Sequence, residues 1–185
     1  MKYMLRTKDI LDEKDPRDRA KNTDVDFPLN DEYKDIIPEM LKHLRYSQIE
    51  KLSKKYDLRP GMGLAAPQLG INKNFFVVCY EVKDGVFDDY ILINPKVISY
   101  SEEMIYAGEG EGCLSVNREV EGIVPRHARI TVEAYDLDGN KRKYRVREDL
   151  AIAFQHELDH LNGILFVDYI DPKDPYKNAD LYREI

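Results

Sequence analysis

The 185-residue chain has no tryptophan and only two cysteines, Cys79 and Cys113. Two cysteines cannot build a disulfide framework, so we expect a reducing compartment. The first twenty residues contain no apolar run of signal-peptide length, which predicts that the chain is not exported. The longest apolar run, Phe75 to Tyr80, is far shorter than the roughly 20 residues that a membrane-spanning helix needs. These absences predict a cytoplasmic protein with no membrane partner.

Positive charge is also in short supply. The chain has 28 Lys and Arg against 35 Asp and Glu, a net charge of −7. This balance argues against direct DNA binding and against a grip on anionic membrane. The one basic run lies in residues 141–147. Because its charges largely alternate with position, we interpret it first as an exposed strand face and second as a nucleic-acid contact.

The N-terminal part predicts a polar arm followed by two helices. Residues 1–29 carry scattered apolar positions and two proline turns, and their function is unreadable from sequence. Asn30 is a good cap for an amphipathic helix, in which Pro38 should introduce a kink or start a new helix. A second helix is expected over residues 48–56.

The rest of the chain predicts strands and one further helix. Strands are expected where β-branched and aromatic residues cluster, namely at 74–80, 90–93, 96–100, 130–135 and 143–146, with a hairpin turn at 138–140. An apolar stripe of helical period predicts a helix over 148–161. The fold class is therefore α+β, with antiparallel sheets packed around that central helix. We expect one domain spanning residues 1–185, made of an arm (1–29), N-terminal helices (30–57) and a core (61–170).

The segment Gln155-His156-Glu157-Leu158-Asp159-His160 predicts a metal site. Two histidines four residues apart lie on one helix face, about 5–6 Å apart at Cβ, within reach of one metal ion. Glu157 occupies the general-base position of the H-E-x-x-H motif. The alternative is a pair of buried structural histidines. A glutamate buried beside them without a metal or partner would be costly, which favours the metal.

A catalytic metal needs a third protein ligand. Position 166, where one protease pattern has its third histidine, is Phe166, and the only glutamate beyond the helix is Glu184. The ligand should therefore come from upstream. Cys113, preceded by a glycine, is the strongest candidate, because a thiolate binds zinc or ferrous iron well. His43, expected at the surface, and His127 are competing ligands.

Three stretches, residues 61–68, 111–115 and 155–160, resemble in order the three signature motifs of the peptide deformylases. The longer N-terminal part is similar to the type 2 branch of Gram-positive bacteria. The resemblance implies a metallohydrolase that removes the N-formyl group from the N-terminal formylmethionine of newly synthesised polypeptides. It implies that formate is released by attack of metal-bound hydroxide. N-formylmethionyl nascent peptides are then the substrates, and the ribosome is a further candidate partner.

The resemblance also assigns residue roles. It implies that Cys113, His156 and His160 hold one divalent metal, natively Fe²⁺, which Zn²⁺, Ni²⁺ or Co²⁺ can replace. Glu157 would be the general base and acid, while Gln68 and the backbone N–H of Leu114 would bind the oxyanion.

Further roles concern the substrate and the support of the ligands. By resemblance, Met62, Ile152 and Ala153 form the apolar pocket for the methionine side chain. Gly63 and Gly112 belong to segments that could pair with substrate backbone as a strand. Glu111 would pair with Arg126 and hold the cysteine loop. Asp159, the carboxylate nearest to the histidines in sequence, would accept a hydrogen bond from one of them.

Two other functions compete with this reading. One is a zinc peptidase of the H-E-x-x-H type, which the missing downstream ligand disfavours. The other is a metal-binding or peptide-binding module without catalysis. The first would cleave internal peptide bonds, and the second would keep its function when Glu157 is replaced.

Overall fold

Three α-helices and five short 3-10 turns make up the helical part of the computed structural model, which describes residues 4–185. The α-helices are α1 (Asp31–Gln48), α2 (Glu50–Tyr56) and α3 (Glu148–Leu161). The 3-10 turns are η1 (Thr7–Asp9), η2 (Pro16–Arg19), η3 (Ala66–Leu69), η4 (Phe166–Tyr169) and η5 (Ala179–Leu181). The helix predicted over 148–161 is confirmed at both ends.

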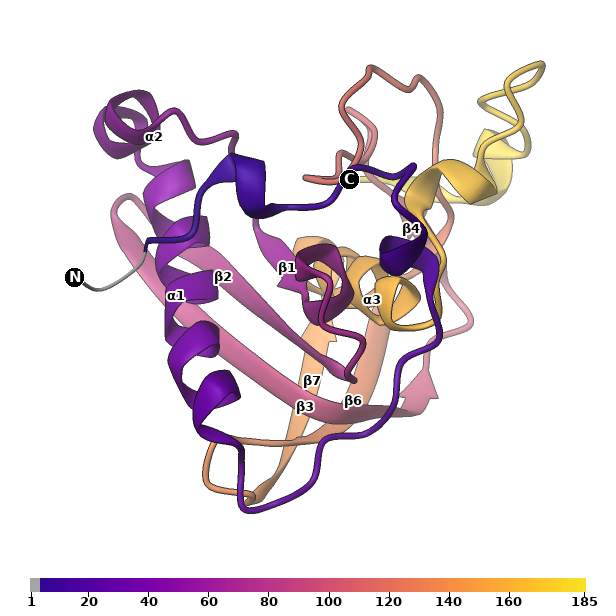
Figure 1. Ribbon diagram of the computed structural model, residues 1–185. Coiled ribbons are helices and arrows are strands. Elements are labelled where there is room, and N and C mark those ends of the chain that lie inside the picture. The colour runs from indigo at the N-terminus through magenta and orange to yellow at the C-terminus, as the bar shows by residue number, and fades with distance from the viewer. Residues whose placement is uncertain (1–3) are drawn as a thin grey trace.

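Two sheets complete the fold (Figure 1). The larger is antiparallel throughout and has the strand order β1-β2-β3-β6-β7. Its strands are β1 (Gly63–Ala65), β2 (Phe75–Lys83), β3 (Val86–Tyr100), β6 (Arg129–Tyr135) and β7 (Lys141–Arg147). In the smaller sheet β4 (Met104–Tyr106) pairs antiparallel with β5 (Arg126–His127) and parallel with β8 (Arg183–Glu184). The α+β prediction is confirmed, and the β4–β8 pair is the one exception to its antiparallel sheets among the described strands.

The larger sheet is covered on both faces where β2 runs through it. Successive side chains of a strand point to opposite faces. Phe75 and Val77 belong to the core cluster that contains α1, whereas Phe76 and Val78 belong to the cluster that contains α3. Helix α1 therefore covers one face of this sheet and α3 the other. This arrangement explains why the apolar run in β2 is continuous rather than alternating.

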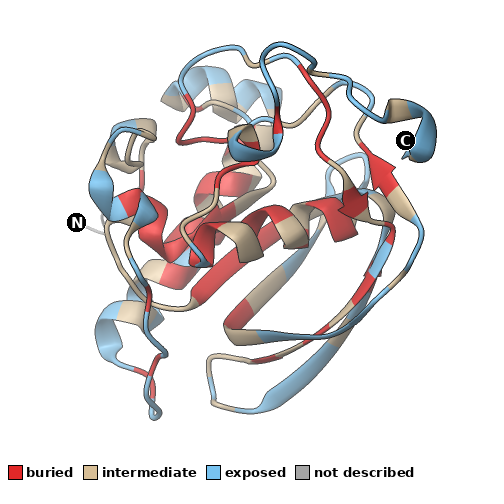
Figure 2. Ribbon diagram, turned by 90° about the vertical axis from the view of Figure 1, so that its right-hand side faces the viewer, coloured by how far each residue is buried: buried red, intermediate tan, exposed pale blue. Residues whose placement is uncertain are grey.

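Helix α3 is anchored on the sheet by Phe154, which is fully buried. Its ring makes edge contacts with Phe76 at 5.8 Å, Tyr90 at 5.4 Å and Tyr144 at 6.1 Å between centroids. Figure 2 shows a largely buried helix running lengthwise through the middle of the molecule, and within α3 only Asp149 is exposed. A helix that is largely buried can present polar side chains to an enclosed site.

For α1, the predicted cap is confirmed, and one of the two alternatives for Pro38 is wrong. Asn30 does cap α1, because its side chain accepts a hydrogen bond from the Glu32 N–H at 2.8 Å. Pro38, however, starts no new helix, and α1 continues through it. A proline removes a single backbone donor, and the apolar face formed by Ile37, Met40 and Leu44 holds the helix on the sheet.

The predicted strands are present but differ in extent. The segments 90–93 and 96–100 are parts of one strand, β3, whose pairing with β6 shifts register between Ile93 and Lys96, across Pro95. A proline supplies no ladder donor, so it is accommodated at this irregularity. The hairpin at 138–140 is confirmed by the β6–β7 pairing, with Gly139 at φ +79°. The short strands β1, β4, β5 and β8 were not predicted.

The basic run lies on β7, and most of it is exposed, as predicted. Lys141 and Lys143 lie 3.5 and 3.8 Å from the Glu133 carboxylate, and Arg142 pairs with Asp136 at 3.0 Å. Much of the charge is therefore neutralised by acidic side chains of the same hairpin.

Among the described helices, none has both the length and the apolar character required to cross a bilayer.

The described part of the N-terminal arm, residues 4–29, packs against the α1 side of the fold and also lies near α3. Leu5, Val25 and Leu29 are buried in the core cluster of α1. Near α3, the guanidinium of Arg19 binds both carboxylate oxygens of Asp168, at 2.8 and 3.0 Å. The arm is therefore packed onto the fold at both ends.

We expect Phe154→Ala to lower the free energy of unfolding by about 3–5 kcal/mol, because it leaves a cavity between α3 and the sheet. Urea denaturation, monitored by circular dichroism, measures this loss. Leu181→Ala is the control, since Leu181 is 68 % exposed. A loss at Phe154 no larger than at Leu181 would contradict the proposed anchoring of α3.

Candidate metal centre

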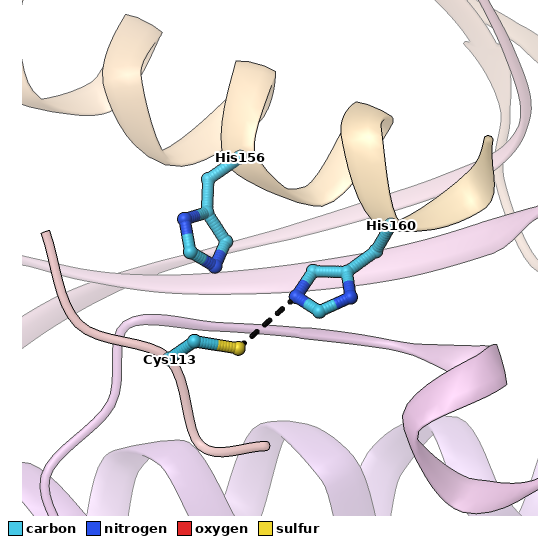
Figure 3. A group of neighbouring side chains, drawn as sticks. All are labelled: Cys113, His156 and His160. Carbon is cyan, nitrogen blue, oxygen red and sulfur yellow. Dashed lines mark hydrogen bonds between the residues drawn. The ribbon is translucent and has the colours of Figure 1, made fainter. Parts of the chain in front are cut away.

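Three side chains from distant parts of the chain converge between α3 and the loop that follows β4. Each of Cys113, His156 and His160 offers one ligand atom, and these three atoms all lie within 4.8 Å of one another. The Cys113 Sγ and the His160 Nε2 are 3.2 Å apart. Figure 3 shows both rings projecting from consecutive turns of α3 toward the cysteine. Two imidazoles and a thiol in this arrangement are a suitable donor set for a single transition-metal ion.

The two competing histidines lie elsewhere. His43 is 1 % exposed, so the prediction of a surface position is wrong. Its Nδ1 lies 3.0 Å from the Leu5 carbonyl oxygen, on the face of α1 that packs against the arm. The Nδ1 of His127 lies 2.7 Å from the Ser101 carbonyl oxygen. Among the described residues, neither histidine belongs to a group of metal-ligating side chains.

A buried ion-pair network holds the first histidine. The Nδ1 of His156 is 2.9 Å from a Glu111 oxygen, which leaves Nε2 for a metal. The Arg126 guanidinium donates to both oxygens of Glu111 at 2.9 Å and to Asp159 at 2.5 Å. The ion pair between Glu111 and Arg126 that the resemblance implied is present. Asp159, expected beside the histidines, binds Arg126 instead, because its position on α3 faces β5.

The network changes the acidity of Glu111. Burial alone would raise the pKa of Glu111, but the hydrogen bonds from His156 and Arg126 outweigh it and lower the pKa to about 2. A carboxylate whose folded pKa lies below its ordinary value contributes stability above that ordinary value, 4.5 here, and the contribution is lost as the pH falls through about 2. At neutral pH Glu111 is therefore a fixed negative charge beside the centre.

Glu157 is enclosed beside the same centre. It is 3 % exposed, and its Oε2 has no hydrogen-bond partner within residues 4–185. Burial raises the pKa of Glu157 to about 7, with the His156 charge opposing the shift and the Asp18 charge adding to it. A Cβ on Gly63 would lie 2.5 Å from Glu157 Oε1, so only glycine allows β1 to approach this carboxylate so closely.

His160 is held in the neutral state that binds a metal ion. Burial and the neighbouring His156 charge lower the pKa of His160 well below its ordinary value. Neutral imidazole is the form that binds metals. Together with the unpartnered oxygen of Glu157, which a water molecule on a metal could satisfy, this donor set fits a divalent cation.

Gln68 and Leu114 lie next to the cysteine. The Gln68 Nε2 donates to the Ser115 hydroxyl at 3.1 Å and lies 3.7 Å from Cys113 Sγ. Its Oε1 accepts from the Ala65 N–H at 2.9 Å, which fixes the amide orientation. Leu114 is buried one residue beyond Cys113. Arg59, which sequence reasoning did not single out, donates to the Cys113 carbonyl at 2.8 Å and so braces this loop.

A cavity of about 660 Å³ opens over the centre. It is lined by all five residues expected to contact substrate: Met62, Gly63, Gly112, Ile152 and Ala153. Gln68, Cys113, Leu114 and Glu157 line it as well. Asn117, Arg118 and Glu119, which also line it, were not anticipated. These polar side chains carry no motif, so only the fold reveals their position.

One further carboxylate lies behind the centre. Asp18, in the η2 turn of the arm, is fully buried, and an oxygen of its carboxylate lies 4.0 Å from His160 Nδ1. Burial raises the pKa of Asp18 to about 6. The sequence offered no signal for this position, because the arm has neither periodicity nor a motif.

Residues 7–176 match a family model described as polypeptide deformylase. The peptide deformylase of Macrococcus caseolyticus is 50 % identical over 175 residues, covering 94 % of this chain and 95 % of that protein. Peptide deformylase 2 of Bacillus anthracis is 45 % identical over 177 residues, 96 % of each chain. The crystal structure of a probable peptide deformylase from Synechococcus phage S-SSM7 superposes with a TM-score of 0.72 at 35 % identity, covering 87 % of this chain and 98 % of that one. The family resemblance read from the sequence is confirmed.

We expect Arg126→Ala to destabilise the protein by about 3–5 kcal/mol, because it leaves Glu111 buried without its ion-pair partner. The variant should also lose bound metal faster, since Glu111 would no longer be held against His156. Urea denaturation and metal content after dialysis against a chelator measure the two effects. Arg129→Ala is the control, because Arg129 is half-exposed and pairs with Glu103 at 2.8 Å. Unchanged metal retention in Arg126→Ala would remove the supporting role.

Proposed function

The chain belongs to the polypeptide deformylase family, and from this premise we propose which of its residues carry out the reaction. The protein is a hydrolase that removes the formyl group from N-formylmethionyl peptides and releases formate. The observation that carries the residue assignment is the convergence of Cys113, His156 and His160 beside a buried glutamate.

Cys113, His156 and His160 would hold the metal, His160 through Nε2 and His156 through the nitrogen that Glu111 leaves free. A divalent cation bound there supplies Lewis-acid chemistry, which activates water for attack at neutral pH. The identity of the cation is part of the proposal. From the family resemblance we infer Fe²⁺ in the native enzyme. Zn²⁺, Ni²⁺ or Co²⁺ would be able to substitute, because one sulfur and two imidazole nitrogens suit all four ions.

Glu157 would act as general base and then as general acid. It takes a proton from the attacking water, whose oxygen forms a bond to the formyl carbon. When the carbon–nitrogen bond breaks, Glu157 returns the proton to the departing amine, so the products are formate and a free methionyl terminus. The raised pKa of Glu157, about 7, suits a group that must accept and donate a proton near neutrality.

Gln68 and Leu114 would stabilise the negative charge that develops on the formyl oxygen. The Gln68 amide is fixed by Ala65 and Ser115. Gln68 and Leu114 both line the cavity. A donor held in place before the reaction costs no reorganisation during it. We propose the Gln68 Nε2 and the backbone N–H of Leu114 as the two donors.

The substrate would lie along β1. Strand β1 is at the edge of the larger sheet and pairs only with β2 among the described strands, so its other edge can accept an extended peptide. Met62 and Gly63 would form one side and Gly112 the other, with Ile152 and Ala153 lining the apolar pocket for the methionine side chain. Backbone pairing of this kind gives little preference beyond the first residue.

We further propose that residues 1–185 act as one catalytic unit of arm, N-terminal helices and core. Its substrates would be nascent chains in the cytoplasm, with the ribosome as a candidate partner.

Glu157→Gln should give a folded enzyme that binds metal but releases formate about 10²–10⁴-fold more slowly, because an amide cannot take up the proton. Formate release from a formylmethionyl peptide is the measurement, with metal content determined on the same samples. Glu102→Gln, at an exposed glutamate, should retain full activity. Wild-type rates of formate release in Glu157→Gln would rule out this role for Glu157.

Purification without oxygen should yield one metal ion per chain and the highest formate release when that ion is iron. Exposure to air should lower activity, because ferrous iron with a thiolate ligand is oxidisable. Cys113→Ala is the control and should retain much less metal. Cleavage of internal peptide bonds without formate release would instead indicate a zinc peptidase.

A further inference from the structure

Asp18 is a buried carboxylate without a partner. It is 0 % exposed, and by distance and angle neither of its carboxylate oxygens has a hydrogen-bond partner between positions 4 and 185. Burial raises the pKa of Asp18, and the nearby Ser115 side chain opposes that rise without forming a bond of normal geometry. Leaving a buried polar group unpaired is costly, and such a group calls for a physical explanation. Asp18 belongs to none of the motifs and does not line the cavity.

The group that Asp18 faces is also unpaired. His160 is fully buried, and within the described part of the chain its Nδ1 has no hydrogen-bond partner. The Nδ1 lies 4.0 Å from Asp18 Oδ1, whereas the Nε2 of the same ring faces the Cys113 Sγ at 3.2 Å. Two unsatisfied buried groups of complementary chemistry therefore lie opposite each other, on the side of the ring away from the metal site.

His156 provides an internal comparison. Its Nδ1 lies 2.9 Å from Glu111, so this histidine already has a carboxylate behind it. A histidine that binds metal through one ring nitrogen usually donates its other N–H to a carboxylate or carbonyl, which fixes the tautomer and the ring orientation. Asp18 occupies the corresponding place behind His160.

We propose that Asp18 is the positioning residue of His160, accepting a hydrogen bond from its Nδ1–H and keeping Nε2 free for the metal. An approach of about 1 Å would bring the two atoms within hydrogen-bond distance. The arm would thereby complete the metal centre. This inference rests on the metal site proposed above.

The arm is held in position on both sides of Asp18. Before it, the Glu13 N–H donates to the Ser115 carbonyl at 2.8 Å, on the cysteine loop. After it, Arg19 binds Asp168, and the Asn22 side chain donates to the Leu161 carbonyl at 2.8 Å, at the end of α3. The arm therefore connects the segment that carries the cysteine to the helix that carries the histidines, with Asp18 between the two attachments.

The proposal predicts that Asp18→Leu weakens metal binding by about 10–100-fold, the usual effect of losing such a partner. Affinity is measured by chelator competition for Co²⁺ or Zn²⁺ on protein stripped of metal, without any activity assay. The stability of the metal-free variant in urea should be equal to or higher than that of the wild type, because the unpaired buried carboxylate is gone. A merely structural Asp18 would instead give lower metal-free stability with unchanged affinity.

Two further variants complete the test. Asp18→Asn keeps an oxygen that can accept from Nδ1–H and should lose less affinity than Asp18→Leu. Asp26→Leu makes the same chemical change at an exposed position of the arm and should bind metal like the wild type. Wild-type affinity in Asp18→Leu, or equal loss in the Leu and Asn variants, would overturn the proposal. A wild-type protein that binds no metal would instead refute the metal site itself.

Discussion

The structure depends on the burial of most of α3. Phe154 fixes the helix to the larger sheet, while His156, Glu157 and His160 on the same helix are also buried. Polar side chains can be buried only if other groups satisfy them. The fold therefore has to bring hydrogen-bonding or metal-binding partners to this part of α3, and the arrangement of the remaining segments follows from that requirement.

Each partner comes from a different segment. The loop after β4 supplies Cys113 and Glu111, β5 supplies Arg126, and β1 passes close enough to Glu157 that only glycine fits at position 63. The arm brings Asp18. Because these segments are far apart in sequence, the centre forms only when the chain is folded. Metal binding then stabilises the folded state, since the unfolded chain offers no preformed site.

The sequence predicted best what is encoded locally. The period of Leu150, Phe154 and Leu158 placed α3 correctly, and the H-E-x-x-H spacing identified two of the three side chains that converge. The apolar run at β2 and the turn at Gly139 are local signals as well, and both elements were found. Its thiol and the preceding glycine made Cys113 the strongest upstream candidate, and resemblance to a family then selected it over His43 and His127. The resemblance also pointed to the pairing of Glu111 with Arg126, which the structure contains.

What failed depended on tertiary contacts. His43 has charged neighbours in sequence, yet it lies on the helix face that meets the arm. Of the two alternatives for Pro38, the new helix is absent because the sheet holds α1 as one helix. Asp159 follows Glu157 by two positions and so points to a different side of α3, toward Arg126. Asp18 carries no local signal at all. The short strands β4 and β8 are too brief to show a period of two and are defined by their pairing.

The central claim is that one thiolate and two imidazoles bind a single ion. X-ray absorption spectroscopy of the zinc-loaded protein tests it most directly. The account predicts one sulfur at about 2.3 Å and two nitrogens at about 2.0–2.1 Å from the metal. A spectrum with no sulfur neighbour, or one that Cys113→Ser leaves unchanged, would contradict it.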